Sequence, residues 1–309
     1  MERILANYHT HSTFCDGSNT PEEMAEAALR RGFHTLGFSG HMDPDIHMDF
    51  PAYVQEIRRL QEKYAGKLEI LLGVELDNVY DPHCAPEAEY IIGSTHFLDV
   101  PPINGEYLSV DSSPENLKKL CDTYFGGDYY VLSAAYYDLE ARVGERLHPT
   151  FVGHFDLVTR FNDLPKEEGG HFLDEDDPAY YEPAMRAMER LVSEELPFEI
   201  NCGAVNRNRK KYFYPHPRLL KHLHELGGEI LISSDAHQRE LIDGAFPEAL
   251  AAAREAGFDS INLLTKEETS AGDSQAKLAL TPADKACGSP ADKRPAKNTK
   301  GLFWSRLKI

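Results

Sequence analysis

The feature that most constrains the fold is an alternation of short apolar runs with longer amphipathic stretches over about the first 260 residues. Seven runs have the character of buried strands: residues 4–9, 35–40, 69–74, 90–94, 151–153, 197–201 and 229–233. Six stretches have helical character, and several begin with a proline after a polar residue: 21–31, 52–64, 114–144, 178–195, 217–226 and 246–256. Strands that alternate with helices pair in parallel, and about seven repeats favour a barrel over an open sheet. We therefore expect an α/β fold with a β/α barrel.

The chain changes character at about residue 265. From there on it is rich in Ala, Lys, Ser, Asp and Pro, and it carries nine Lys or Arg against five Asp or Glu. Large apolar residues are few until the segment around Trp304, the only tryptophan of the chain. We expect a barrel domain over residues 1–264 and a disordered tail over 265–309 that ends in a short apolar segment.

Charge and composition narrow the range of partners. The formal net charge of −19 repels nucleic acid and anionic membrane surfaces. The sequence has no signal-peptide run and no apolar stretch of about 18 residues that would span a membrane. Its five cysteines are scattered and form no CxxC pair, which favours a reducing compartment. We expect a cytoplasmic protein that binds a small molecule, with no nucleic-acid or membrane partner.

Side chains able to bind metals follow six of the seven predicted strands, all at the same end. They are His9 and His11, His41, Glu75, His96, His154, and Asp235 with His237, and Asp16 lies in the first loop. One histidine at a strand end is more often a structural group than a ligand, but packing does not explain the same placement on six strands. The carboxyl ends of barrel strands meet at one rim, so these groups should be neighbours in space. Imidazole with carboxylate suits Zn²⁺, Mn²⁺ or Fe²⁺, and we expect two or three such ions.

The local sequence around these residues is similar to that of a known family. The chain resembles the polymerase and histidinol phosphatase (PHP) superfamily, and within it the histidinol-phosphatase branch. The resemblance covers roughly residues 1–262 and leaves out the tail. It is carried by His9-Thr-His11-Ser12, Cys15-Asp16-Gly17, Gly40-His41, Gly73-Val74-Glu75, Gly93-Ser94-Thr95-His96, Gly153-His154-Phe155-Asp156, Glu199-Ile200-Asn201 and Ser234-Asp235-Ala236-His237.

The resemblance implies a distorted seven-stranded TIM-like barrel with three metal ions at its C-terminal rim. It assigns the ligands in three groups: His9, His11, Glu75 and Asp235 for the first metal, Glu75, His96 and His154 for the second, and Asp16, His41 and His237 for the third. The aspartate at position 16, which is a histidine in some relatives, favours the histidinol-phosphatase branch.

The implied reaction is the hydrolysis of a phosphate monoester by a hydroxide held between two metals. Asp235, Glu75 and His41 are the expected catalytic residues, and Arg160 and Arg207 are expected to bind the phosphate. The proton for the leaving group comes from His41, Asp156 or Asp43, and the sequence does not decide among them. On the family pattern the substrate is L-histidinol phosphate and the pathway is histidine biosynthesis.

Other interpretations stay open at this point. The acidic loop 43–49 binds the substrate amine or is merely solvated, and Tyr107 is a candidate to stack on an imidazole. A PHP phosphoesterase acting on nucleotides or other small phosphates would use the same ligands. A proofreading nuclease is disfavoured by the acidic charge of the body. A metal-binding scaffold protein is a further alternative, in which the segment around Trp304 recruits a protein partner.

Overall fold

Seven short strands lie in one parallel sheet in the order of the sequence. The computed structural model describes residues 6–46, 48–266, 294–297 and 299–309. The strands are β1 (Ala6–Asn7), β2 (Thr35–Met42), β3 (Glu69–Asp77), β4 (Tyr90–Ser94), β5 (Phe151–Val152), β6 (Phe198–Asn201) and β7 (Ile230–Ser233). A parallel bridge between Thr10 and Ala236 joins the two outer strands, and the amide of His11 donates to the carbonyl of Ala236 at 2.9 Å. The sheet thus closes almost completely, which confirms the predicted barrel.

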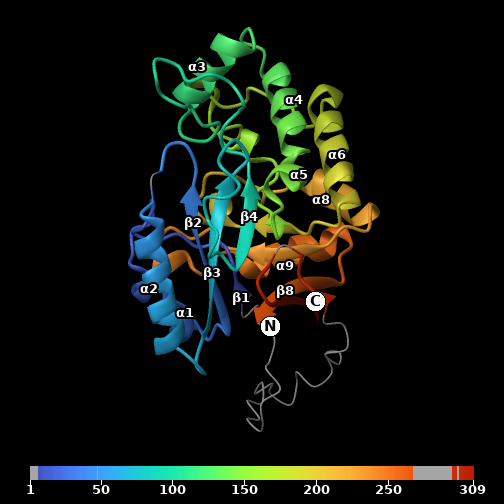
Figure 1. Ribbon diagram of the computed structural model, residues 1–309. Coiled ribbons are helices and arrows are strands. Elements are labelled where there is room, and N and C mark those ends of the chain that lie inside the picture. Colours follow the sequence, from blue (N-terminus) through green and yellow to red (C-terminus); the bar gives the residue numbers. More distant parts are fainter. Residues whose placement is uncertain (1–5, 47, 267–293, 298) are drawn as a thin grey trace.

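Helices cover the outside of this barrel (Figure 1). They are α1 (Pro21–Arg31), α2 (Phe50–Lys63), α3 (Pro114–Tyr124), α4 (Tyr129–Glu140), α5 (Val143–Leu147), α6 (Pro178–Ser193), α7 (Gly203–Asn206), α8 (Pro217–Glu225) and α9 (Phe246–Ala256), with single 3-10 turns at Leu157–Thr159, Lys166–Glu168 and Arg239–Leu241. The start of α1 follows from its sequence, because Thr20 and Glu23 form a reciprocal capping box. In the described part of the chain, every helix is too short or too polar to cross a membrane.

The single helix expected over residues 114–144 is wrong. The structure divides this stretch into α3, α4 and α5. Between α3 and α4, Gly126 and Gly127 have φ values of 64° and 78°, in the left-handed region that ends a helix. The side chain of Asp128 then accepts hydrogen bonds from two backbone amides and begins α4.

A second, smaller sheet corrects the expected domain boundary. It contains β8 (Ser260–Lys266), β9 (Arg294–Pro295) and β10 (Leu302–Lys308), and β10 pairs antiparallel with both of the others. The apolar segment around Trp304 is therefore a strand, and Trp304 is only 4% exposed. Residues 267–293 of the expected tail lie outside the described residues. The scaffold hypothesis loses its main support, because the tryptophan on which it rested is packed against the barrel.

The small sheet covers the end of the barrel opposite α3 (Figure 1). There, Trp304 and Leu302 belong to one buried cluster with Tyr8 and Tyr90 from the barrel interior. The hydroxyl of Tyr90 lies 2.6 Å from the carbonyl oxygen of Tyr8 and 3.1 Å from that of Phe38. The amide of Leu264 in β8 donates to the hydroxyl of Tyr8 at 2.8 Å. These contacts fix the backbone that leads directly into His9.

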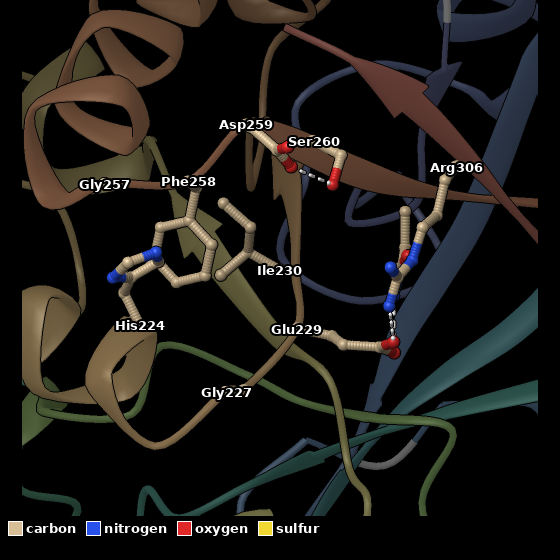
Figure 2. Close-up of a pocket in the computed structure, with 11 residues that line it drawn as sticks. His224, Gly227, Glu229, Ile230, Gly257, Phe258, Asp259, Ser260 and Arg306 are labelled. Carbon is tan, nitrogen blue, oxygen red and sulfur yellow. Dashed lines mark hydrogen bonds and ion pairs between the residues drawn. The ribbon is translucent and has the colours of Figure 1, made fainter. Parts of the chain in front are cut away.

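A hollow of about 380 Å³ also lies at this end of the barrel (Figure 2). It is lined by the turn before β7 and the start of β8, and the ion pair between Glu229 and Arg306 borders it at 2.6 Å. Ile230, on its wall, is the first residue of β7. The hollow is therefore at the N-terminal ends of the strands, away from the histidines predicted to form the site.

Candidate metal centre

The structure brings all nine predicted metal-binding residues into one cluster at the C-terminal ends of the strands. Four groups of three or four have ligand atoms within 4.8 Å of one another, and together they include His9, His11, Asp16, His41, Glu75, His96, His154, Asp235 and His237. The strand register explains part of this arrangement, because His41 in β2 is the direct partner of Glu75 in β3. Seven of the nine are buried; Asp16 and His237 are the more exposed members.

Glu75 lies at the centre of the cluster and its two oxygens face different histidines. Oε1 is 2.7 Å from Nε2 of His154 and 3.3 Å from Nε2 of His96. Oε2 is 3.1 to 3.5 Å from a ring nitrogen of each of three other residues: His9, His11 and His41. Burial would raise the pKa of Glu75, but His9, His41 and His96 hold it well below its usual range. Glu75 is therefore an anion, with Oε1 facing His96 and His154 and Oε2 facing His9, His11 and His41.

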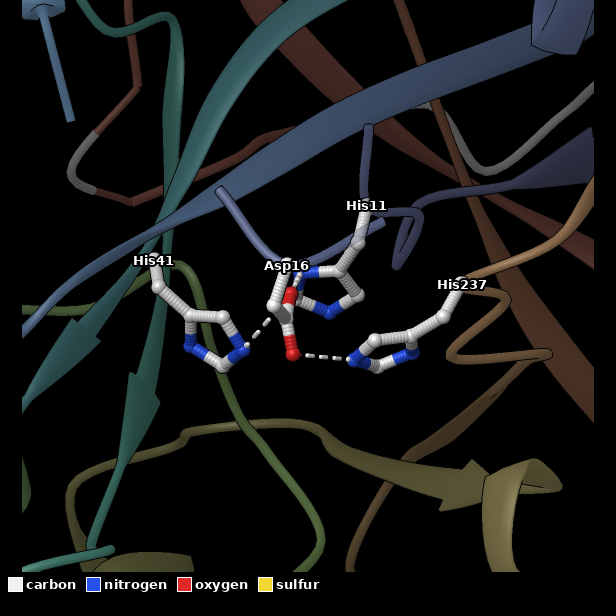
Figure 3. A group of neighbouring side chains, drawn as sticks. All are labelled: His11, Asp16, His41 and His237. Carbon is white, nitrogen blue, oxygen red and sulfur yellow. Dashed lines mark ion pairs between the residues drawn. The ribbon is translucent and has the colours of Figure 1, made fainter. Parts of the chain in front are cut away.

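The outer part of the cluster is built around Asp16 (Figure 3). Its carboxylate lies 2.9 Å from Nε2 of His237 and 3.6 Å from a ring nitrogen of His11 and of His41. The Asp16 side chain is 41% exposed, so this group opens towards solvent. Burial, together with the neighbouring His237 and His41, lowers the pKa of His11 to about 3, which keeps its imidazole neutral and able to bind a cation.

Several buried nitrogen and oxygen atoms of the cluster have no hydrogen-bond partner, as expected for a site that binds divalent cations. Among the described residues, five such atoms belong to the cluster: Nε2 of His9, Nε2 of His11, Nδ1 of His41, Oε2 of Glu75 and Nδ1 of His154. An unsatisfied buried polar atom costs about 1–3 kcal/mol. Four of these atoms are neighbours: Oε2 of Glu75 and the ring nitrogens of His9, His11 and His41. A cation bound among them would coordinate all four. Only nitrogen and oxygen donors are present, which suits Zn²⁺, Mn²⁺ or Fe²⁺.

The two predicted phosphate-binding residues differ in how they contact the cluster. Nη2 of Arg207 is 3.3 Å from Oδ2 of Asp235, and its Nη1 is 3.0 Å from Nδ1 of His237. This approach requires a glycine at position 203, because a Cβ there would be 2.5 Å from Oδ2 of Asp235. Arg160 instead pairs with Asp111 at 2.7 Å. Both arginines are therefore held by carboxylates at the edge of the cluster.

Comparison with known proteins gives the family. The model of the PHP domain matches residues 7–203. The chain belongs to the PHP domain family. Two curated relatives, the probable histidinol-phosphatases of Schizosaccharomyces pombe and Deinococcus radiodurans, are each 28% identical to it. The matches cover 74% of this chain and 79% of the yeast protein, and 82% of this chain and 94% of the bacterial one.

A solved structure gives the same fold for this PHP domain. The histidinol phosphate phosphatase of Lactococcus lactis, complexed with zinc, L-histidinol and phosphate, has a TM-score of 0.60 at 22% identity. The match covers 83% of this chain and 95% of the Lactococcus chain. The seven-stranded barrel is therefore shared with a protein that binds these three ligands.

Two of the three candidates for the leaving-group proton, the aspartates, differ in their surroundings. Asp156 is fully buried, accepts a hydrogen bond from the amide of His216 at 2.9 Å, and burial raises its pKa to about 7. Asp43 lies beside the cluster, with Oδ2 3.7 Å from Nδ1 of His41. Of the two aspartates, only Asp43 has its carboxylate next to a residue of the cluster. Tyr107, by contrast, is 47% exposed on the outer loop.

Sequence reasoning missed two carboxylates that orient histidines of the PHP domain. Oε2 of Glu199, in β6, is 3.0 Å from Nδ1 of His9, and Oδ2 of Asp77, in β3, is 3.3 Å from Nδ1 of His96. When a carboxylate accepts a hydrogen bond from Nδ1–H, the other ring nitrogen, Nε2, carries no proton and can bind a metal. The signal was present, because β6 was the one barrel strand without a predicted metal ligand and Glu199 belongs to one of the motifs that carry the family resemblance. Asp77 also follows Glu75 at the i+2 spacing that places both on one face.

Replacing Asp77 with asparagine should weaken metal binding without removing a ligand. Loss of such a supporting carboxylate typically lowers metal affinity by about 10–100-fold. Titration of the metal-free protein with Mn²⁺ or Zn²⁺ measures this change. Asp81→Asn, on the exposed loop that follows β3, is the control and should bind metal like the parent. Equal affinities for the Asp77 and Asp81 variants would show that Asp77 does not support His96.

Glu140, at the end of α4, gives a prediction about pH. It is fully buried, and burial raises its pKa to about 8 although a hydrogen bond with the side chain of Thr95 acts in the opposite direction. The folded protein keeps the proton that the unfolded chain releases above its ordinary pKa of 4.5, so stability falls as the pH rises from about 4.5 to 8.

Glu140→Gln should remove this dependence. Between pH 5 and pH 8 the parent should lose about 3 kcal/mol of unfolding free energy through Glu140, since one pKa unit is worth about 1.4 kcal/mol. The variant should not show this loss, so its stability relative to the parent rises by the same amount. Urea unfolding of both proteins in the presence of a chelator measures it without a contribution from metals. The exposed Glu182→Gln serves as the control. Stability curves that run parallel for parent and Glu140→Gln would contradict the assignment.

Proposed function

We propose that this chain is a metal-dependent phosphoric monoester hydrolase that converts L-histidinol phosphate and water into L-histidinol and phosphate, a reaction of histidine biosynthesis. The observation that carries the proposal is the cluster of nine ligand residues around Glu75, whose two oxygens face separate groups of histidines. The choice of substrate is supported by relatives named for this activity and by the Lactococcus protein, which binds L-histidinol and phosphate in the same fold.

The residues divide into three ligand sets for Mn²⁺, Zn²⁺ or Fe²⁺. His9, His11, Glu75 and Asp235 would hold the first ion, Glu75 with His96 and His154 would hold the second, and Asp16, His41 and His237 would hold the third. The orphaned nitrogen and oxygen atoms around Glu75 support the first set in particular. When bound, the cations supply positive charge that stabilises the phosphoryl oxygens and promotes ionisation of the attacking water.

The protein's own residues orient the substrate and manage its charge. Arg207 and Arg160 bind phosphoryl oxygens from the edges of the cluster, because guanidinium groups match phosphate geometry. Asp235 is kept anionic: burial raises its pKa, but Arg207 and His9 hold it well below the usual range. Its backbone has a φ of 47°, a strained conformation of the kind found at functional sites.

A proton must reach the oxygen of the leaving alcohol. Asp43 holds it at Oδ2, next to His41. Burial raises the pKa of this carboxyl, which favours the protonated form. Oδ1 accepts hydrogen bonds from the amides of Asp45 and Ile46, both at 2.7 Å, so the loop keeps Oδ2 turned towards the cluster.

The test is phosphate release by the full chain, expressed with Mn²⁺, from L-histidinol phosphate and from a panel of nucleotides and sugar phosphates. We expect a strong preference for L-histidinol phosphate, with two or three metal ions per chain by elemental analysis. Removal of the metals with a chelator should abolish turnover, and Mn²⁺ should restore it. Preference for a nucleotide would retain the phosphoesterase and overturn the substrate. No turnover by the metal-loaded protein would overturn the enzyme assignment.

A further inference from the structure

The loop between β4 and α3 returns to the metal centre and brings a carboxylate with it. After His96 the chain leaves the rim, and Ser109 pairs with Phe97 in an antiparallel bridge. The amide of Val110 then donates to the carbonyl of His96 at 2.8 Å, and the Val110 side chain is fully buried. The next residue, Asp111, is therefore held beside a proposed metal ligand although it lies 15 positions further along the chain.

Asp111 is paired with Arg160, which comes from a different part of the barrel. Oδ2 of Asp111 is 2.7 Å from Nη1 of Arg160, and the two side chains are 16% and 18% exposed. Arg160 directly follows the 3-10 turn Leu157–Thr159, and its amide donates to the carbonyl of Leu157 at 2.8 Å. Within the described ranges, Asp111 is the one carboxylate in an ion pair with Arg160.

Charged groups of the cluster act on both members of this pair. Burial would raise the pKa of Asp111, but Arg160, His96 and His154 lower it overall. Burial would lower the pKa of Arg160, but Asp111 and the more distant Asp235 and Asp16 raise it. The geometry agrees with these charges, because Asp111 directly follows Val110, whose amide donates to the carbonyl of His96. A long arginine side chain loses conformational entropy when it binds a ligand, and an ion pair that already fixes its position reduces that loss.

We propose that Asp111 is a positioning residue, which holds the guanidinium of Arg160 where it contacts the phosphoryl oxygens of the substrate. Asp111 itself touches no substrate atom. The loop 97–113, which carries Asp111, thereby increases the affinity of the site for phosphate. This inference rests on the proposed function in one respect, that the substrate is a phosphate monoester, and not on which alcohol is released.

The experiment compares Asp111→Asn with the parent, both as full-length metal-loaded chains. We expect KM for the phosphate ester and the inhibition constant of inorganic phosphate to rise about tenfold, with kcat changed less than about threefold, as for loss of a uniform binding contact. Metal content and inhibition by L-histidinol should not change. Asp99→Asn is the matched control on the same loop, because Asp99 is 68% exposed and 3.8 Å from Arg146.

A double-mutant cycle tests whether Asp111 acts through Arg160. In an Arg160→Met background, Asp111→Asn should cause no further loss, since the group that it positions is gone. Additive losses would overturn the proposal, and so would a fall in metal content. Weaker inhibition by L-histidinol with unchanged inhibition by phosphate would also overturn it, by showing that Asp111 binds the leaving group. The same measurements with p-nitrophenyl phosphate separate failure of this inference from failure of the substrate assignment.

Discussion

Glu75→Gln is expected to lower turnover by roughly a thousandfold or more and to reduce the metal content of the protein. The carboxylate contacts five histidines through two oxygens, and glutamine replaces one of these oxygens with an amide nitrogen that cannot bind a cation. Lewis-acid stabilisation by metals is worth several kcal/mol, and each 1.4 kcal/mol or so corresponds to a factor of about ten in rate. Elemental analysis and phosphate release on the same preparation measure both effects.

Glu69→Gln is the matched control, because Glu69 begins the same strand that Glu75 is part of. Its oxygens accept hydrogen bonds from the amide of Lys266 and the hydroxyl of Thr35, far from the cluster. That variant should keep its metals and its turnover. A Glu75→Gln protein with full metal content and normal turnover would rule out the bridging role, whatever the substrate.

Trp304→Ala should destabilise the fold by about 3–5 kcal/mol, the usual cost of removing a buried large aromatic side chain. Trp304 is 4% exposed and packs in the cluster that contains Tyr8 and Tyr90 at the base of the barrel. Chemical denaturation of parent and variant measures the change in unfolding free energy. At temperatures where the variant is folded, its metal content should stay close to that of the parent, because the cluster lies at the other end of the strands.

Trp304→Phe keeps much of the apolar contact and should lose clearly less stability than the alanine variant. Replacement of the partly exposed Ser305 by alanine, on the same strand, should have little effect. If Trp304→Ala left stability unchanged but abolished the capture of a protein partner, the packing described here would be wrong and the recruiting role would return.

The elements that build the metal centre were readable from the sequence because their signals are local. Strand β4 and helices α1 and α9 have the expected bounds, and the other barrel strands differ only at their ends. Residues 4 and 5 of the expected first strand lie outside the described residues. Once strands alternate with helices, parallel pairing brings their carboxyl ends to one rim. The spacing of His9 and His11, and of Asp235 and His237, therefore sufficed to predict that these side chains meet.

The features that were missed depend on contacts that local sequence does not encode. Strand β10 pairs with β8 across the intervening residues 267–301, whose Ala, Lys, Ser, Asp and Pro composition predicted a disordered tail. The basic side chains of β10 instead pair with acidic ones of the barrel, as Arg306 does with Glu229 and Lys308 with Asp259. Asp111 was equally hidden, because its partner Arg160 is 49 positions away.

The hydrogen bond from Leu264 to Tyr8 has a consequence for synthesis of the chain on the ribosome. Tyr8 and the histidine after it emerge early, yet Ala236, Leu264 and Trp304, which help to hold this segment in place, emerge more than 220 residues later. Contacts of such sequence separation form slowly, because a long loop must close first. Early in synthesis the first strand is thus held only by its neighbour β2 and by Tyr90, and the ligand set for a metal is complete only when His237 has joined the fold.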